Sequence, residues 1–140
     1  MTTLMSAQEL TALLEREFPQ IEMGREFVIE SVSPMGAVMR LKGQEKHLRP
    51  GGTMSGPAMF LLADVAFYVA IMAQIGPQSL TVTTNLNINF LRKPEPGDLV
   101  AEIKLLKLGK RLAVGECFLH SPGDPEPVAH ATGTYSIPPR

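Results

Sequence analysis

Residues 58–73 read A-M-F-L-L-A-D-V-A-F-Y-V-A-I-M-A, a run of sixteen residues in which Asp64 is the only charged side chain. The run is shorter than the ~20 residues that a membrane-spanning helix needs, and a carboxylate at its centre is costly in lipid. Gly56-Pro57 before it and Gly76-Pro77 after it are typical of the start and the end of a helix. A helix that is apolar on all sides is buried in a protein core, so the run predicts one long core helix.

The segments on either side of this helix predict an antiparallel sheet. Ser6–Glu9 matches a capping box, and the leucines that follow predict a helix that ends at Pro19. Short runs rich in apolar residues, separated by turn signals, are typical of strands. We expect strands at 26–33, 37–41, 80–90, 99–108, 111–120 and 128–137. The expected fold class is α+β, an antiparallel sheet of five or six strands with one long buried helix and an extra N-terminal helix.

The composition is that of one globular domain, residues 1–140, which we divide into an N-terminal helix region (1–24) and a core (25–140). A net charge of −1 excludes a strongly basic nucleic-acid-binding surface, and a single cysteine excludes an internal disulfide or a paired-cysteine metal site. The histidines lack metal-ligand spacing, so we expect no metal and no other cofactor. The first thirty residues contain no apolar signal-peptide core, so we expect a cytoplasmic protein without nucleic-acid or membrane partners.

Asp64 is the first candidate for chemistry. An ionised carboxylate is costly to bury without partners, so its place in an apolar helix needs an explanation. One explanation is a structural brace that binds a hydroxyl group on a neighbouring strand. The other is a general base or nucleophile, and the sequence leaves both open.

The strand expected at 80–90 carries neutral polar residues at alternate positions. Because side chains alternate between the two faces of a strand, we expect these residues to share one face. Such a face is typical of a solvated sheet or a subunit contact, and equally of a polar wall that holds water or substrate near Asp64. The residues are Thr81, Thr83, Asn85, Asn87 and Asn89.

A loop rich in glycine and proline, residues 49–57, precedes the long helix. The N–H groups at a helix start attract developing negative charge, so Gly56 could donate its N–H to a carbonyl oxygen as an oxyanion hole. Gly56 and Asp64 are eight residues apart, about 12 Å along a helix, which is too far for both to contact one carbonyl. If they cooperate, the site combines Gly56 of one subunit with Asp64 of another and requires at least a dimer.

These residues resemble the hot-dog fold, in which a sheet wraps around one long helix, and in particular the phenylacetate-pathway (PaaI-type) acyl-CoA thioesterases. The resemblance covers about residues 25–136. Its most specific parts are G-P-A-M-F-L-L-A-D-V-A (56–66) and V-T-T-N-L-N-I-N-F-L-R-K-P (82–94). It implies that Asp64 is the catalytic carboxylate, that Gly56 is the oxyanion-hole glycine and that Thr83 positions the attacking water.

Two positions depart from the family pattern. Ser55 stands where the family has the histidine of a His-Gly-Gly loop, and Arg49 stands where it commonly has an asparagine that serves catalysis. The oxyanion donor is a backbone group and survives both changes. Coenzyme A carries phosphates, so we expect substrate-binding residues among the polar and basic side chains near the loop, the polar strand and the following turns. These are Arg49, Ser55, Asn85, Arg92, Lys93, Lys110 and Arg111.

The expected function is hydrolysis of acyl-CoA thioesters to a free acid and coenzyme A, in a homodimer or a dimer of dimers. Asp64 would act as base on a water oriented by Thr83 and Asn85, or as the nucleophile. Three alternatives stay open: a non-catalytic acyl-CoA or fatty-acyl binding protein of the same fold, a hot-dog hydratase or dehydratase, which usually needs a His–Asp/Glu pair, and an interaction protein in which Asp64 is only a brace.

Overall fold

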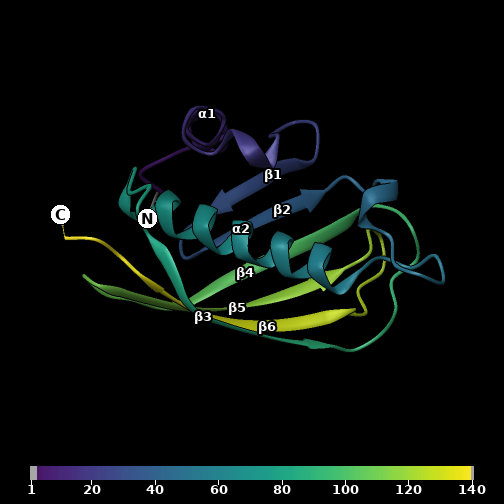
Figure 1. The fold of residues 1–140 in the computed structure, drawn as a ribbon. Helices are drawn as coiled ribbons and strands as arrows, with labels where there is room; N and C mark the ends of the chain where they lie inside the picture. Colours follow the sequence, from purple (N-terminus) through teal and green to yellow (C-terminus); the bar gives the residue numbers. More distant parts are fainter. Residues whose placement is uncertain (1–2, 140) are drawn as a thin grey trace.

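The computed structural model describes residues 3–139, and in it one sheet curves around one long helix (Figure 1). The six strands lie in the order β1-β2-β4-β5-β6-β3, and every neighbouring pair is antiparallel. This arrangement confirms the expected α+β class with six strands. The bounds are Phe27–Ser33 for β1, Gly36–Leu41 for β2, Val82–Phe90 for β3, Leu99–Leu108 for β4, Leu112–His120 for β5 and Ala129–Ser136 for β6.

The long helix, α2, spans Gly56–Ile75, as the glycine–proline pairs predict. Ser55 caps its start, because the Ser55 hydroxyl oxygen accepts a hydrogen bond from the Ala58 N–H over 3.2 Å. At the other end Gly76 adopts a φ of 91°, a backbone conformation that glycine tolerates far better than other residues. Both ends are therefore fixed by local sequence.

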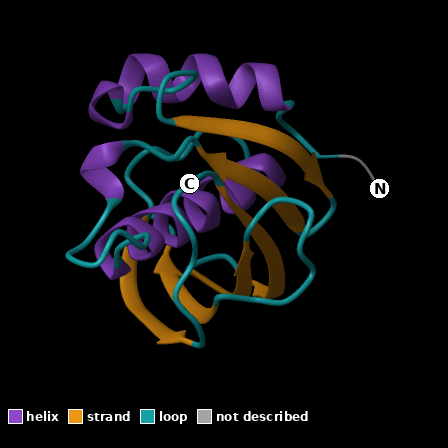
Figure 2. Ribbon diagram, turned by 90° about the vertical axis from the view of Figure 1, so that its right-hand side faces the viewer, coloured by secondary structure: helices purple, strands orange, loops and turns teal. Residues whose placement is uncertain are grey.

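The interior of α2 is buried because the sheet wraps around it (Figure 2). Phe67 lies against β5 and β6 at two glycines, where a Cβ atom would come within 3.0 Å of the ring at Gly115 and within 3.1 Å at Gly133. The helix α2 is long enough and, with a mean hydropathy of 2.0, apolar enough to cross a membrane. Most of it is buried within the protein, however, and the core helix of a soluble protein has the same length and composition. Most of its apolar surface therefore belongs to the core, although Phe60 and Leu61 near its start are exposed.

The N-terminal helix, α1, spans Ala7–Glu17 and begins with the predicted capping box of Ser6 and Glu9. It packs on β1 and α2 through three buried leucines, and it lies at the β1 end of the sheet in Figure 1. The helix ends two residues before Pro19, and Pro19–Ile21 then forms a single 3₁₀ turn. A second such turn, Glu45–His47, precedes α2. Glu17 and Phe18, at the end of α1, line a cavity beside α2.

Candidate active site

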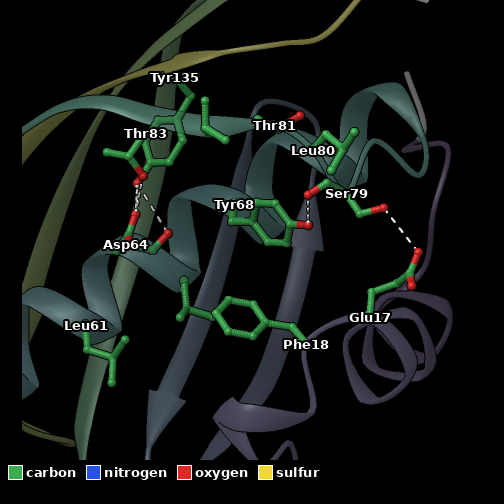
Figure 3. Close-up of a pocket in the computed structure, with 12 residues that line it drawn as sticks. Glu17, Phe18, Leu61, Asp64, Tyr68, Ser79, Leu80, Thr81, Thr83 and Tyr135 are labelled. Atoms are coloured by element: carbon green, nitrogen blue, oxygen red, sulfur yellow. Dashed lines mark hydrogen bonds between the residues drawn. The ribbon is translucent and has the colours of Figure 1, made fainter.

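A cavity of about 520 Å³ opens beside the middle of α2, next to the half-buried Asp64 (Figure 3). Its walls come from the end of α1, from α2, from the segment that enters β3 and from β6. Apolar and aromatic side chains predominate. The lining residues are Glu17, Phe18, Leu61, Asp64, Val65, Tyr68, Ser79, Leu80, Thr81, Val82, Thr83 and Tyr135.

The Asp64 carboxylate accepts two hydrogen bonds on the same oxygen. Thr83 Oγ1 donates to Asp64 Oδ1 over 2.7 Å, and the Tyr135 hydroxyl donates to Oδ1 over 2.7 Å. Tyr135 is 1% exposed, and burial together with the negative charge of Asp64 raises the pKa of Tyr135. The phenol therefore keeps its proton and acts as a donor. Among residues 3–139, no hydrogen-bond donor contacts the second carboxylate oxygen, Oδ2.

A β-bulge in β3 orients the Thr83 side chain toward Asp64. Thr83 lies opposite Tyr135 on β6, but Asn85 lies opposite Thr134, so Thr84 is an extra residue in β3. After the bulge, the polar side chains of β3 are exposed on the outer face of the sheet. The interpretation of these residues as one polar wall facing Asp64 is therefore wrong beyond Thr83, whereas the alternative of a solvated sheet face fits the exposed residues after it. The structure does not bring Asn85 to Asp64. The outward residues are Asn85, Asn87 and Asn89.

The end of the cavity away from Asp64 is also polar. The Tyr68 hydroxyl donates to the Ser79 carbonyl oxygen over 2.7 Å, and Ser79 Oγ donates to Glu17 Oε1 over 3.2 Å (Figure 3). Burial raises the pKa of Tyr68. Thr81 is almost fully buried here, and its hydroxyl has no hydrogen-bond partner within the described residues. Neither Tyr68 nor Ser79 was expected from the sequence.

A second cavity, of about 500 Å³, lies at the start of α2 beside Gly56. A Cβ atom at Gly56 would lie 3.3 Å from the Phe90 ring, so this glycine packs against the end of β3. In the described part of the chain, no residue accepts a hydrogen bond from the Gly56 N–H. The lining residues are Arg49, Thr53, Met54, Gly56, Met59, Phe90, Leu91, Arg92, Lys93 and Pro94.

The expected basic residues divide into two groups. Arg49, Arg92 and Lys93 all line the cavity at Gly56. Of these, Arg92 is bound to Glu126 over 2.6 Å and donates to the Pro127 carbonyl oxygen. The other two expected residues, Lys110 and Arg111, precede β5 at the turn after β4 and line neither cavity.

Gly56 and Asp64 lie in separate cavities that share no lining residue. Gly56 packs against Phe90 at the end of β3, whereas Asp64 binds Thr83 near its start. The separation agrees with the distance of about 12 Å that eight residues of helix predict. Within one chain, the two groups cannot contact the same carbonyl.

A buried cluster that the sequence analysis missed supports the loop before α2. His47 Nδ1 accepts from the Gln44 N–H over 3.0 Å, which assigns the ring proton to Nε2, and Nε2 lies 2.8 Å from Glu26 Oε1. Burial by itself would raise the pKa of Glu26, but hydrogen bonds from His47 and Lys46 hold it below its usual value. The His47 carbonyl oxygen accepts from the Ser55 N–H over 2.8 Å, so the cluster is tied directly to the helix cap.

No group of three or more His, Cys, Asp and Glu side chains within residues 3–139 is arranged to hold a metal ion. The chemistry that these residues can supply is that of a carboxylate base or nucleophile, a backbone N–H donor and basic side chains. The carboxylate lies in the cavity at Asp64, whereas the N–H donor and the basic side chains lie in the cavity at Gly56.

Comparison with known proteins identifies the family. Residues 51–128 match the model of the thioesterase superfamily. A Pseudomonas aeruginosa protein named as a putative esterase is 31% identical over 96% of this chain and 100% of its own length.

Solved structures agree with this match. A putative thioesterase from Silicibacter sp. TM1040 is 51% identical, with a TM-score of 0.90 over 99% of this chain and 96% of that one. A point mutant of the phenylacetic acid degradation protein PaaI from Thermus thermophilus is 26% identical, with a TM-score of 0.74 over 86% and 99%. The resemblance to PaaI-type proteins and the hot-dog fold are thereby confirmed. The chain belongs to the thioesterase superfamily.

Proposed function

We propose that the protein hydrolyses acyl-CoA thioesters to a free acid and coenzyme A, in an active site shared between two subunits. Asp64 is the base or nucleophile, and the Gly56 N–H of the other subunit is the oxyanion donor. The observation that carries the proposal is the Asp64 carboxylate in the wall of an apolar cavity, with Oδ1 bound by Thr83 and Tyr135 and with Oδ2 free of any donor within residues 3–139.

The reaction needs only these groups. In the base route, Asp64 Oδ2 takes a proton from water while the water oxygen bonds to the thioester carbonyl carbon. The carbonyl oxygen becomes negative and accepts a hydrogen bond from the Gly56 N–H. The C–S bond then breaks, and protonated Asp64 returns the proton to the leaving sulfur. The Thr83 hydroxyl donates its hydrogen bond to Oδ1, and the lone pairs of its oxygen can accept a hydrogen bond from the water.

In the nucleophilic route, Asp64 Oδ2 itself bonds to the carbonyl carbon, and the thiolate leaves with the bonding electrons of the C–S bond. Water then hydrolyses the resulting anhydride and restores the carboxylate. Both routes use the same carboxylate oxygen and the same oxyanion donor, so both require Asp64 and Gly56 to meet at one carbonyl.

An edge-to-edge dimer would bring the two groups together. β3 is an edge strand of nine residues, and apolar side chains at its two ends are exposed, including Leu80 (77%), Val82 (54%), Phe90 (51%) and Leu91 (53%). A long edge strand with unpaired backbone groups is a ready surface for pairing with another strand. In a two-fold dimer through β3, the two strands run antiparallel, so the start of one lies beside the end of the other. Asp64 of one subunit would then face Gly56 of its partner.

The basic residues fit the coenzyme A part of the substrate. Arg49 and Lys93 make no ion pair with another residue in the range 3–139, and both line the cavity at Gly56. An ester whose carbonyl docks at Gly56 can place its phosphates near these cations, while its acyl group enters the partner's cavity beside Asp64. Lys110 and Arg111 lie at the sheet end where β3 begins, since Leu112 and Val82 both pair with Ser136. They would approach the same ligand only in the dimer.

The histidines argue against the hydratase alternative. His47, His120 and His130 are hydrogen-bonded to Glu26, Glu102 and Glu116 respectively. None of them contacts Asp64 of the same chain, so within residues 3–139 the carboxylate has no histidine partner of the kind that such hydratases usually use.

The test is thiol release from a panel of acyl-CoAs of increasing chain length, with the matching oxygen esters run in parallel. Cys117 is buried and burial raises the pKa of its thiol, so a thiol reagent added to the folded protein reports free coenzyme A without a protein background. We expect the wild type to release coenzyme A from at least one ester. Binding of acyl-CoA with no release would overturn the proposal in favour of a binding protein.

A further inference from the structure

The Asp64 carboxylate is held from one side only. Thr83 on β3 and Tyr135 on β6 both donate to Oδ1, each over 2.7 Å, and Oδ2 has no donor among the described residues. A carboxylate with one donor can turn about its Cβ–Cγ bond, whereas two donors from different strands fix its plane. The two oxygens are thus chemically unequal.

The backbone builds this arrangement. Thr83 and Tyr135 are directly opposed in the β3–β6 ladder, so their side chains share the face that meets α2. The bulge at Thr84 follows immediately, and Thr84 Oγ1 donates to the Thr134 carbonyl oxygen over 3.1 Å. In a regular strand with Thr84 paired in the ladder, Thr83 and Asn85 would share one face, so Thr83 would point outward and could not contact Asp64.

Tyr135 is the more rigid of the two donors. Its ring packs on Phe67 of α2 with centroids 5.4 Å apart, and it is 1% exposed, whereas Thr83 is exposed in the single chain. Its hydroxyl also lies 3.3 Å from the Asp64 carbonyl oxygen, which ties the phenol to both the main chain and the side chain of one residue. A side chain packed in this way cannot turn its hydroxyl elsewhere.

We propose that Tyr135 is a positioning residue for the reaction: with Thr83 it occupies Asp64 Oδ1, and so it assigns Oδ2 as the single oxygen that meets the water or the thioester. This inference rests on the proposed catalytic role of Asp64. Because Tyr135 acts on the carboxylate and not on the bound ester, it affects turnover and leaves substrate affinity unchanged.

The test compares Tyr135→Phe with Tyr68→Phe, using an ester that the wild type hydrolyses. Both variants remove one phenol hydroxyl from the same cavity, but Tyr68 donates to the Ser79 carbonyl oxygen and not to Asp64. We expect kcat of Tyr135→Phe to fall about ten- to a hundredfold with KM within about twofold, as for one lost hydrogen bond to a charged group. Tyr68→Phe changes the wall of the cavity proposed to hold the acyl group, so any loss in that variant should appear in KM, whereas the loss in Tyr135→Phe should appear in kcat. A wild-type kcat in Tyr135→Phe would overturn the inference.

A double variant separates a shared role from two independent ones. If both donors are needed to fix Oδ1, then Thr83→Val combined with Tyr135→Phe should be no more impaired than the worse single variant, within about threefold. If the fold-loss of kcat in the double variant equals the product of the two single losses, the two donors act independently, and the joint role is overturned. Thr83→Ser, which keeps the donor, should restore the activity that Thr83→Val loses.

A second measurement covers the case in which Tyr135→Phe does not fold. The chain has two tyrosines, so 3-fluorotyrosine incorporated in Tyr68→Phe protein labels position 135 alone. We expect Asp64→Asn to move the ¹⁹F resonance, and an unmoved resonance would overturn the inference. Full activity in Asp64→Asn would instead refute the proposed function, whereas an inactive Asp64→Asn beside a fully active Tyr135→Phe would refute this inference alone.

Discussion

The two cavities along α2 differ in charge and in what they can supply to a reaction. Among residues 3–139, the cavity at Gly56 is lined by three basic side chains and by no acidic one. The cavity at Asp64 is lined by two acidic side chains and, within the same residues, by no basic one. The first can bind an anionic ester and stabilise an oxyanion, and the second can activate water and hold an acyl group. If the proposed function holds, one chain carries both halves of a hydrolytic site but keeps them apart.

This difference suggests why a dimer would be the functional unit. The basic and the acidic cavities lie at opposite ends of β3, so antiparallel pairing of two β3 edges would match each with its complement. Such a dimer would hold two equivalent sites, each with one cavity from either subunit. Substitutions in either cavity test whether one supplies the base and the other supplies the oxyanion donor.

Asp64→Asn should have the largest effect. The amide oxygen can still accept from Thr83 and Tyr135, but it is not basic, so kcat should fall about a hundred- to ten-thousandfold. The melting temperature should stay within about 5 °C of the wild type, because the packing is kept. The measurement is kcat and melting temperature on the same sample. A lower melting temperature with an unchanged kcat would make Asp64 a brace and remove the acidic cavity from the chemistry.

Gly56→Pro should come next, because it deletes the proposed oxyanion donor while proline remains well tolerated in the first turn of a helix. We expect kcat to fall about a hundredfold or more. Gly56→Ala is the matched control, since it adds a Cβ atom beside Phe90 but keeps the N–H. If alanine and proline reduce kcat equally, the effect is steric and the N–H has no role.

Thr83→Val compared with Asn85→Ala tests the bulge in β3. Thr83 donates to Asp64 whereas Asn85 is exposed on the outer face, so we expect kcat to fall about ten- to a hundredfold in the first variant. In Asn85→Ala it should change by less than about twofold, as for a surface substitution. Equal losses would mean that β3 presents a continuous polar face to the site after all.

Arg49→Ala and Lys93→Ala should have the smallest effects and act on binding. Exposed charge contacts are weak, so each variant should raise KM for an acyl-CoA about two- to fivefold with little change in kcat. Added salt should raise the wild-type KM and shrink the difference. Lys107→Ala is the control, because Lys107 is exposed on β4 and lines neither cavity. An equal change in that variant would assign the effect to overall charge.

The helix and its ends were predictable because their determinants are local. Gly56-Pro57, Gly76-Pro77 and the apolar run between them specify α2 within a single stretch of chain. The distance between Gly56 and Asp64 follows from helix geometry alone. For the same reason the sequence predicts that Gly56 and Asp64 of one chain do not contact the same carbonyl.

A hydroxyl contact from a neighbouring strand to Asp64 was foreseen, and Thr83 makes it, but the contact of Tyr135 with Asp64 was not predictable because it depends on pairing between distant segments. Tyr135 lies 71 residues from Asp64, and only the β3–β6 register brings it opposite Thr83. The bulge at Thr84 has no glycine to mark it, so strict alternation placed Asn85, Asn87 and Asn89 on the wrong face. One signal was available: a tyrosine in a core strand needs a partner for its hydroxyl, and Asp64 was the buried acceptor in need of one.

The most direct test of the shared site is complementation between two inactive variants. Asp64→Asn and Gly56→Pro chains are co-expressed with different tags, and the mixed dimer is isolated. A shared site combines the intact Gly56 of one chain with the intact Asp64 of the other, so each mixed dimer should regain one of two sites, about half of the wild-type kcat per dimer. An inactive mixed dimer of normal melting temperature would contradict the account, because it would place the Gly56 and Asp64 that act together in the same chain.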